Sequence, residues 1–531
     1  MRPIDLNIKN FTSFRPHQLE IAAQVYCVFQ NGFKYALVEA PTGSGKTVLG
    51  ITVAKLEQEP QPVLYIAADK KLQVQCWQDF KNEAEILMGR NNYRCSKHPE
   101  LSADCCDKRS LICDKCPLAL APINCKPDEK QRCTCRDFCA YELQKFKTMM
   151  APIGILNPAY YLQEINSAGL FSGRNLVIID EADVLEQQLM EFIELSIPAT
   201  VITRYNLQPS PKYKTKPDSW REWALQTLEI VNARISQINT LWGVEDIKEM
   251  VALERLRNKL QFFAQEADDN WVFDFETNTY RPIRIAPYSQ RFIWKHAEHF
   301  LMMSATLSPW RQLASDLGID VAQTTFFKVP STFPPERNIT HIRPVADMGH
   351  KNIEAEFPKM LREFDNILDL HPTEKGLCHC VSYAILKGIQ EHSRHHNRLI
   401  IHNSFTRQAI LQQFMNSTEP LVLLSPSFER GVDLKDDYCR FIILAKMPFG
   451  YLGDRQIAAR LYSSGKDGRR WYNAMAARRV VQCLGRGMRS PTDYCTNYVL
   501  DSNFVRFYEQ NKLMFPQWFR NTLKFEEVVT V

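Results

Sequence analysis

Apolar runs bounded by glycine and polar turns mark the first part of the chain. Residues 34–56, KYALVEAPTGSGKTVLGITVAKL, are typical of a buried strand, a glycine turn and a helix. Two more strands are indicated within 62–72, PVLYIAADKKL, and 175–185, NLVIIDEADVL, whose apolar residues follow one another without alternation. Such strands are typical of parallel sheets covered on both faces. The pattern therefore predicts a first α/β domain.

The pattern changes between residues 190 and 295. Segments 220–242 and 245–267 place apolar residues three and four positions apart, which predicts a helical insertion. Strand and turn signals return at 300–309, FLMMSATLSP, and STFPPERN at 331–338 is a candidate linker. A second alternation of strands and helices runs through 375–389, 421–434 and 439–452. We therefore expect a second α/β domain after the linker.

A third kind of segment is polar and rich in cysteine. Nine of the 16 cysteines lie within residues 95–139, where few other apolar residues could build a core. In a reducing compartment, such dense cysteines favour a metal or redox role over disulfides. Metal ligation would supply the stability that a small apolar core cannot. The scattered cysteines are expected to be small buried hydrophobes; they are Cys27, Cys76, Cys378, Cys380, Cys439, Cys483 and Cys495.

Composition narrows the class of protein. With 531 residues, 45% hydrophobic and 24% charged, the chain is expected to be globular, with roughly three or four domains. Its longest apolar runs are far short of the roughly 20 residues that span a bilayer, and its N-terminus lacks the apolar stretch of a signal peptide. We expect a cytoplasmic protein without a membrane partner. The net charge of +5 permits nucleic-acid binding without requiring it.

The segment APTGSGKT, residues 40–47, predicts a phosphate-binding loop for ATP. Lys46 would contact the β and γ phosphates, and the Thr47 hydroxyl would bind Mg²⁺. Ala40 stands where the strict pattern has its first glycine. The alternative is an ordinary glycine turn at a helix start. The residues expected to surround the phosphates with backbone amides are Thr42, Gly43, Ser44 and Gly45.

Asp180 and Glu181 follow the apolar run LVII directly. An ATPase needs one carboxylate to hold Mg²⁺ and a second to orient or deprotonate the attacking water. Taken alone, an Asp-Glu pair at a strand end can be a helix cap. After a phosphate loop, it indicates a catalytic pair.

The order of short motifs resembles that of the superfamily 2 helicases of the XPD and DinG type, iron–sulfur ATPases that move along single-stranded DNA. The motifs in chain order are FRPHQ, EAPTGSGKT, YIAADKKLQVQ, GRNNYRC, CAYE, ILNPAYYL, DEAD, MMSATLS, KGLCHCVSY, SPSFERGVDL and QCLGRGMRS. The resemblance implies an α/β fold of two RecA-like motor domains, with a cysteine-rich metal-cluster insertion and a helical arch insertion in the first. The expected segments are 1–88, 146–189 and 296–330 for motor domain 1, 89–145 for the iron–sulfur domain, 190–295 for the arch, and 331–531 for motor domain 2.

The resemblance also implies roles for individual residues. Gln18 would read the adenine, Ser304 and Thr306 would couple hydrolysis to domain movement, and Asp433 would belong to the site between the motor domains. The residues expected to reach the γ phosphate from motor domain 2 are Gln482, Arg486 and Arg489. A guanidinium supplied by a moving domain stabilises a transferring phosphoryl group. The alternative for this basic segment is a solvated helix.

Three features depart from the family's pattern. Asp183 stands where the acidic motif usually ends in histidine, and we expect this to alter how the ATP site communicates with the SAT motif while leaving both catalytic carboxylates intact. Arg430 stands before the glycine of GVDL, where the family often has glutamate, and Glu429 comes one position earlier. The cysteine segment holds nine cysteines where four would suffice.

The tryptophans of the predicted arch are expected to be core residues rather than base-stacking platforms; they are Trp220, Trp223, Trp242 and Trp271.

The implied cofactor of the cysteine segment is a 4Fe–4S cluster. Cys95 and Cys139 match the family's first and last ligands, Cys133 matches a spacing found in several members, and Cys125 is our choice for the fourth. Cys113 and Cys116 resemble another arrangement and could replace Cys125 and Cys133. Two alternatives for the surplus are spare thiols and a separate zinc site; the zinc ligands would be Cys105, Cys106, Cys113 and Cys116.

The expected function is that of an ATP-dependent DNA helicase that moves on single-stranded DNA, with a 5′ to 3′ direction implied by the resemblance. Its expected partners are single-stranded and forked DNA, and replication or repair proteins are candidates. We expect a monomer, associated with the nucleoid in a bacterium or lying in the host cytoplasm if it comes from a phage. One alternative is a nucleic-acid-stimulated ATPase that remodels RNA-containing or protein-bound structures. A more distant one is a non-enzymatic zinc module on a degenerate ATPase.

Overall fold

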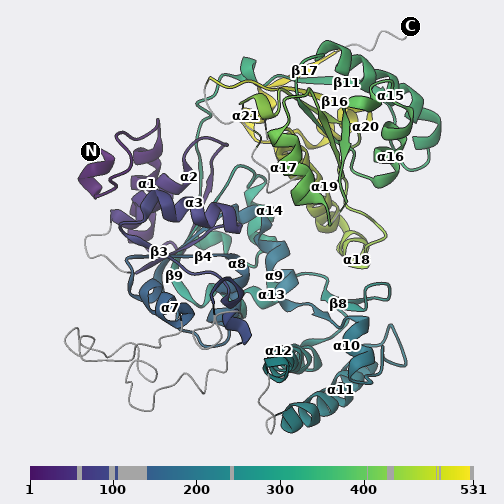
Figure 1. Ribbon diagram of the computed structural model, residues 1–531. Helices are drawn as coiled ribbons and strands as arrows, with labels where there is room; N and C mark the ends of the chain where they lie inside the picture. Colours follow the sequence, from purple (N-terminus) through teal and green to yellow (C-terminus); the bar gives the residue numbers. More distant parts are fainter. Residues whose placement is uncertain are drawn as a thin grey trace.

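The chain forms two α/β domains and a helical insertion (Figure 1). The computed structural model describes residues 1–56, 62–94, 102–105, 140–238, 244–403, 405–426, 434, 436–485, 487–488 and 492–526. Within these residues, no helix combines the length and the apolar character needed to cross a bilayer. The predicted α/β class is confirmed, because each domain is built on a parallel sheet of seven strands.

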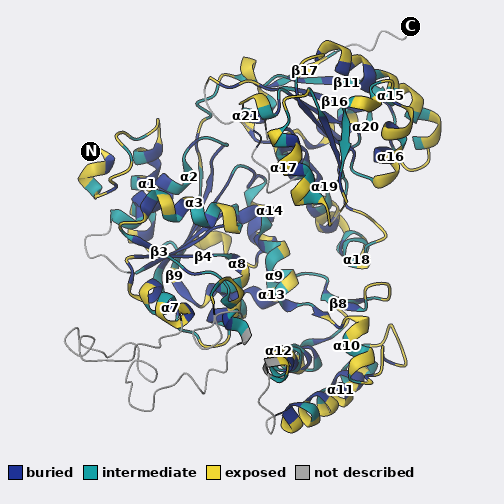
Figure 2. Cartoon of the chain, viewed as in Figure 1, coloured by how far each residue is buried: buried dark blue, intermediate teal, exposed yellow. Residues whose placement is uncertain are grey.

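The first domain is built on a sheet with the order β10-β1-β9-β5-β2-β4-β3. All neighbouring strands are parallel, and the central strands are buried on both faces, as their unbroken apolar sequences predict (Figure 2). The strands are β1 (Tyr35–Glu39), β2 (Val63–Ile66), β3 (Ala84–Ile86), β4 (Ile153–Leu156), β5 (Arg174–Asp180), β9 (Ala297–Ser304) and β10 (Thr324–Lys328).

Helices cover both faces of this sheet. One core contains side chains from α1 (Gln18–Gln30), α2 (Lys46–Lys55) and α3 (Lys70–Phe80). The core on the opposite face contains side chains from α7 (Ala140–Met150), α8 (Pro158–Ile165), α9 (Leu185–Ile193) and α14 (Trp310–Asp316). The short helix α13 (Ala286–Ser289) and the turn η5 (Gln290–Trp294) lead back into β9.

The second domain repeats this architecture with the strand order β13-β14-β12-β15-β16-β11-β17, again all parallel. Its strands are β11 (Thr340–Ala346), β12 (Gly376–His379), β13 (Leu399–Ile401), β14 (Val422–Ser425), β15 (Phe441–Leu444), β16 (Thr496–Asp501) and β17 (Leu523–Phe525). Its helices are α15 (Ile353–Leu370), α16 (Tyr383–His392), α17 (Arg407–Asn416), α18 (Arg455–Ser463), α19 (Gly465–Leu484), α20 (Asn503–Asn511) and α21 (Gln517–Arg520).

The helical insertion lies between β5 and β9 of the first domain. It consists of α10 (Ala199–Arg204), the antiparallel pair α11 (Pro217–Ile238) and α12 (Val244–Glu266), and a small antiparallel sheet of β6 (Leu195–Ser196), β8 (Thr279–Pro282) and β7 (Trp271–Asp274). Trp220, Trp223 and Trp271 are each 3% exposed. Their predicted core role is therefore confirmed, whereas Trp242 lies outside the described residues.

The two flanks of the cysteine segment lie side by side on the first domain. Tyr93 and Tyr141 pack edge to face with ring centroids 5.7 Å apart, and the Tyr93 carbonyl accepts a hydrogen bond of 2.7 Å from the Ala103 amide. The Tyr141 hydroxyl is 2.7 Å from that of Tyr160 on α8. The chain therefore leaves and re-enters the domain at one place. Cys95 and residues 106–139, which include Cys125, Cys133 and Cys139, lie outside the described residues.

Candidate nucleotide site between the two domains

The loop between β1 and α2 has the shape that the sequence predicts for phosphate binding. Gly43 and Gly45 have φ angles of +79° and +76°, which favour glycine, and Gly45 is the N-cap of α2. A Cβ atom at Gly45 would collide with the Gln18 side chain, and one at Gly43 with the ring of Phe333. The first amides of α2 lack partners within the helix, which suits an anion. The buried Ser44 hydroxyl, which lacks a hydrogen-bond partner within the described part of the chain, fits this purpose.

The Gln18 side chain holds the phosphate loop in place through hydrogen bonds to its backbone. Its amide nitrogen donates to the carbonyl oxygens of Ser44 and Gly45 at 3.0 and 3.1 Å, and its amide oxygen accepts from the Arg15 amide at 2.7 Å. Both ends of the side chain are therefore engaged by the protein. Adenine recognition by Gln18 stays a prediction.

Two carboxylates lie beside the loop, at the end of β5. The Lys46 Nζ atom is 3.2 Å from Glu181 Oε1. Glu181 has a φ of +49°, which is uncommon for a residue with a side chain and turns the chain sharply after the strand. Burial raises the pKa of Asp180 to about 6, against the opposing effect of the Lys46 ammonium. A bound cation would favour the ionised carboxylate.

Tyr65 on β2 connects the two predicted magnesium ligands. Its hydroxyl donates to Asp180 Oδ2 at 3.0 Å and lies 3.3 Å from Thr47 Oγ1. The carboxylate and the hydroxyl are thereby held on one small patch of oxygen atoms, the kind of ligand that Mg²⁺ prefers. Tyr65 does not stand out in the sequence, where it is only a phenol hydroxyl inside an otherwise apolar strand.

Asp183 joins three motifs. Its carboxylate accepts hydrogen bonds from Ser304 Oγ at 2.8 Å, from Thr306 Oγ1 at 3.0 Å, and from the side-chain amide of Gln482. Ser304 also lies 3.2 Å from Glu181 Oε2. Asp183 was noticed only as a departure from the family's histidine, yet it connects the acidic motif, the SAT motif and the second domain.

Gln482, on α19, is the predicted γ-phosphate residue that the structure describes. Besides Asp183, its amide contacts Thr306 Oγ1 at 3.3 Å. In this arrangement Gln482 contacts the SAT motif of the first domain, and its contact with a phosphate stays a prediction. Arg486, Arg489 and Asp433, together with Glu429 and Arg430, lie outside the described residues.

A cleft of about 400 Å³ opens beside the loop, between the two domains. Thr42 and Phe333 line it from the first domain and the linker, and Met488 and Trp518 line it from the second domain. Glu39 also lines it, and the Ser308 amide donates to the Glu39 carboxylate at 2.7 Å. Burial raises the pKa of Glu39.

Comparisons with known proteins agree with this architecture. Residues 365–522 match the Helicase C-terminal domain, and residues 11–107 match the family described as Type III restriction enzyme, res subunit. A solved XPD helicase structure aligns with a TM-score of 0.64 and 18% sequence identity, over 96% of this chain and 99% of that chain. The chain has the XPD helicase fold. The predicted pair of RecA-like domains is therefore confirmed.

Two curated relatives carry the name ATP-dependent DNA helicase YoaA. The relative from Haemophilus influenzae is 24% identical over 39% of this chain, and the relative from Escherichia coli is 23% identical over 34%. The matches span 33% and 28% of those relatives' own lengths. Together with the fold, they confirm the resemblance to the XPD and DinG type of superfamily 2 helicases.

Proposed function

We propose that the chain is an ATP-dependent DNA helicase that moves on single-stranded DNA in the 5′ to 3′ direction and unwinds duplexes. The observation that carries this proposal is the contact between Gln482 of the second domain and Asp183 of the first, which shares its partner Ser304 with Glu181. A nucleotide bound there would change how the two domains meet. The name of the YoaA relatives supports ATP and DNA as the substrates.

In the proposed hydrolysis, Lys46 and the amides at the start of α2 bind the phosphates. Thr47 and Asp180 would hold Mg²⁺, which neutralises phosphate charge when it is bound. Glu181 would orient or deprotonate the attacking water, and its distance of 3.2 Å from the Lys46 ammonium supports this role. Arg486 and Arg489 would approach the γ phosphate when the domains close.

We propose the following division of the chain. Residues 1–88, 146–189 and 296–330 form motor domain 1, and residues 331–531 form motor domain 2. The iron–sulfur domain, 89–145, and the arch, 190–295, are insertions in motor domain 1. The adjacent flanks of the cysteine segment and the position of the helical insertion between β5 and β9 support this division.

We further propose that residues 95–139 hold one 4Fe–4S cluster, with Cys95, Cys125, Cys133 and Cys139 as ligands. The support is the number of thiols in a segment poor in apolar residues, and flanks that are fixed side by side by Tyr93 and Tyr141. Flanks that lie together suit a cluster whose first and last ligands, Cys95 and Cys139, directly follow and precede them in the sequence. Protein purified without oxygen should be brown and contain roughly four irons per chain. A colourless protein with zinc alone would contradict the cluster.

Cys139→Ser should bleach that colour and abolish unwinding, while part of the ATPase activity survives in the motor domains. Cys27→Ser is the matched control and should change neither property, because Cys27 on α1 is exposed, in contrast to the burial expected from the sequence. A Cys139→Ser protein that keeps both colour and unwinding would remove Cys139 from the ligand set.

Strand displacement tests the helicase proposal. Purified chain should hydrolyse ATP faster with single-stranded DNA and should separate forked DNA that has a 5′ tail. Duplexes with a 3′ tail test direction, and RNA hybrids or protein-blocked DNA test the remodelling ATPase as the other outcome. We infer a monomer in the cytoplasm, with replication or repair proteins as candidate partners. Hydrolysis without displacement of any DNA fork would overturn the helicase assignment.

A further inference from the structure

Helix α18 of the second domain is attached to the first domain near its C-terminal end. Arg460, in the last turn of α18, is 1% exposed. Its guanidinium is 2.7 Å from Asp316 on α14 and pairs with Glu186 in the first turn of α9. The Glu186 carboxylate also accepts a hydrogen bond of 3.2 Å from the Trp471 indole, and the guanidinium lies 4.1 Å from that ring's centroid.

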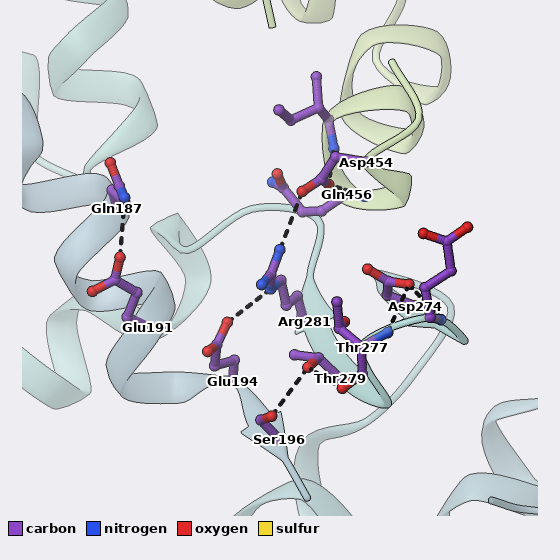
Figure 3. A network of polar contacts seen from close by, with 12 residues as sticks. Gln187, Glu191, Glu194, Ser196, Asp274, Thr277, Thr279, Arg281, Asp454 and Gln456 are labelled. Atoms are coloured by element: carbon purple, nitrogen blue, oxygen red, sulfur yellow. Dashed lines mark hydrogen bonds and ion pairs between the residues drawn. The ribbon is translucent and has the colours of Figure 1, made fainter. Parts of the chain in front are cut away.

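The other end of α18 is attached through Arg281 on β8, at the base of the helical insertion (Figure 3). Arg281 Nε is 2.7 Å from Glu194 Oε2, and Arg281 NH1 is 3.2 Å from Asp454 Oδ2. Glu194 is the C-cap of α9, and Asp454 is the N-cap of α18. Arg281 therefore connects the end of one helix to the start of the other across the domain boundary.

Two more contacts strengthen this second attachment. The Gln456 side-chain amide donates to the Ile283 carbonyl at 2.8 Å. The ring of Phe275, in the turn between β7 and β8, lies 3.7 Å from the Arg455 guanidinium and 5.1 Å from Lys214 Nζ. The hairpin of β7 and β8 thus contacts the first turn of α18 through an ion pair, a hydrogen bond and an aromatic ring.

The two attachments fix the angle between the helices. At about 1.5 Å per residue, Glu186 and Glu194 lie about 12 Å apart along α9, and Asp454 and Arg460 about 9 Å apart along α18. One attachment alone would leave α18 able to pivot. In this arrangement, two attachments at opposite ends hold α18 along α9, and α9 begins only one short turn after Asp180 and Glu181.

We propose that Arg281 is a positioning residue that couples the helical insertion to the movement of the second domain. When the domains move, α18 moves with the second domain. Arg281 transmits this movement to the hairpin of β7 and β8, which belongs to the same insertion as α11 and α12. The helical insertion therefore moves when the two domains move relative to each other, and does not stay in a fixed position. This inference rests on the proposed helicase function, because the coupling is useful only if domain movement does work on DNA.

The variants Arg281→Gln and Asp454→Asn each remove the ion pair. Asparagine keeps an oxygen in the place of Asp454 Oδ1, which caps α18 by accepting from the amides of Gln456 and Ile457 at 2.8 and 3.1 Å. We expect unwinding to slow about fivefold in each variant, with ATP hydrolysis within about twofold of the unaltered chain. The double variant should be no slower than either single one, because both remove the same contact.

Arg291→Gln is the matched control, since the described partners of the Arg291 guanidinium, which are Glu266 at 3.0 Å and the rings of Phe262 and Phe292, all precede the second domain. It should leave unwinding and the number of ATP molecules used per base pair unchanged. If Arg281→Gln slows unwinding and Asp454→Asn does not, Arg281 acts through Glu194 alone and the proposal fails. An equal loss of ATPase and unwinding would also overturn it.

Hydrogen exchange tests the coupling without DNA. Adding ADP with beryllium fluoride should change exchange in both peptides 271–282 and 454–463 of the unaltered chain. In Arg281→Gln, the change in 454–463 should persist, and that in 271–282 should fall about fivefold. Identical responses in the two proteins would refute the coupling. Failure of the helicase proposal is separate: the unaltered chain would then displace no strand, whatever its exchange pattern.

Discussion

The phosphate loop and the boundary between the two domains are built on different principles. The loop, Lys46 and the Asp180–Glu181 pair belong to one domain, where they follow β1 and β5 of a single sheet, with β9 between these two strands. The contacts of Asp183 with Gln482 and of Glu186 with Arg460 exist only where two domains meet. The first region is therefore preformed, whereas the second changes whenever the domains move. Substitutions in the two regions should separate chemistry from coupling.

The largest effect is expected in the preformed region. Lys46→Ala removes the ammonium that lies beside Glu181 and is predicted to contact the β and γ phosphates of bound ATP. ATP hydrolysis should therefore fall about a thousandfold. Single-stranded DNA binding should persist, because it rests on other basic and stacking groups. Turnover and DNA affinity, measured on the same preparation, check this. Wild-type turnover would disprove the nucleotide site, and Lys55→Ala, at the other end of α2, is the control that should retain hydrolysis.

The next effect concerns the domain boundary. Arg460→Met keeps most of the side-chain volume but leaves Glu186 and Asp316 buried without their shared cation. Breaking a buried ion pair in this way costs about 3 kcal/mol, so the thermal unfolding of the variant should begin at a lower temperature. Arg394→Met removes an exposed pair with Asp369 and should cost less than about 0.5 kcal/mol. Equal shifts in the two variants, measured by calorimetry, would show that Arg460 has no special structural role.

A smaller effect is expected at Asp183. Asp183→Asn retains one acceptor oxygen but removes the charge that three donors share. Losing a charged hydrogen bond costs about 1.5 kcal/mol, which corresponds to about a tenfold loss of turnover. ATP affinity should change little, because the donors to Asp183 are Ser304, Thr306 and Gln482 of the SAT motif and the second domain. A variant that loses ATP binding and keeps its turnover at saturation would contradict this coupling role.

These contrasts also explain what the sequence could predict. The strands of both domains follow from unbroken apolar runs, and the phosphate loop and the two carboxylates follow from spacing within a few residues. For local patterns of this kind, a short stretch of sequence is enough to predict the structure. The pair of Glu186 and Arg460, separated by 274 residues, has no local pattern, because both residues look like ordinary surface charges on helices.

The site shows the same division. Lys46, Asp180 and Glu181 were predicted from motifs, and the structure brings these three together. Tyr65 and the hub role of Asp183 were missed, since a hydroxyl in a strand and one altered motif position do not reveal which distant donors will face them. The predicted roles of Gln18 and Gln482 require a bound nucleotide, so the contacts of the protein alone do not decide them.

The smallest effect is a pH dependence at the same boundary. Burial raises the pKa of Asp316 to about 6, and the neighbouring Glu186 adds to this, against the opposing effect of Arg460. Because this folded-state pKa lies above the ordinary value of 3.8, the folded chain binds more protons here than the unfolded chain. The contribution of Asp316 to stability is therefore greatest at low pH and declines as the pH rises towards 6.

Asp316→Asn removes that decline while keeping a side chain that can accept from Arg460 at the same place. The difference in unfolding temperature between the variant and the unaltered chain should consequently shift in the variant's favour from pH 4.5 to pH 7. A difference that is constant with pH, or that shifts against Asp316→Asn, would mean that Arg460 keeps Asp316 ionised across this range and that the buried contact is a fully charged one.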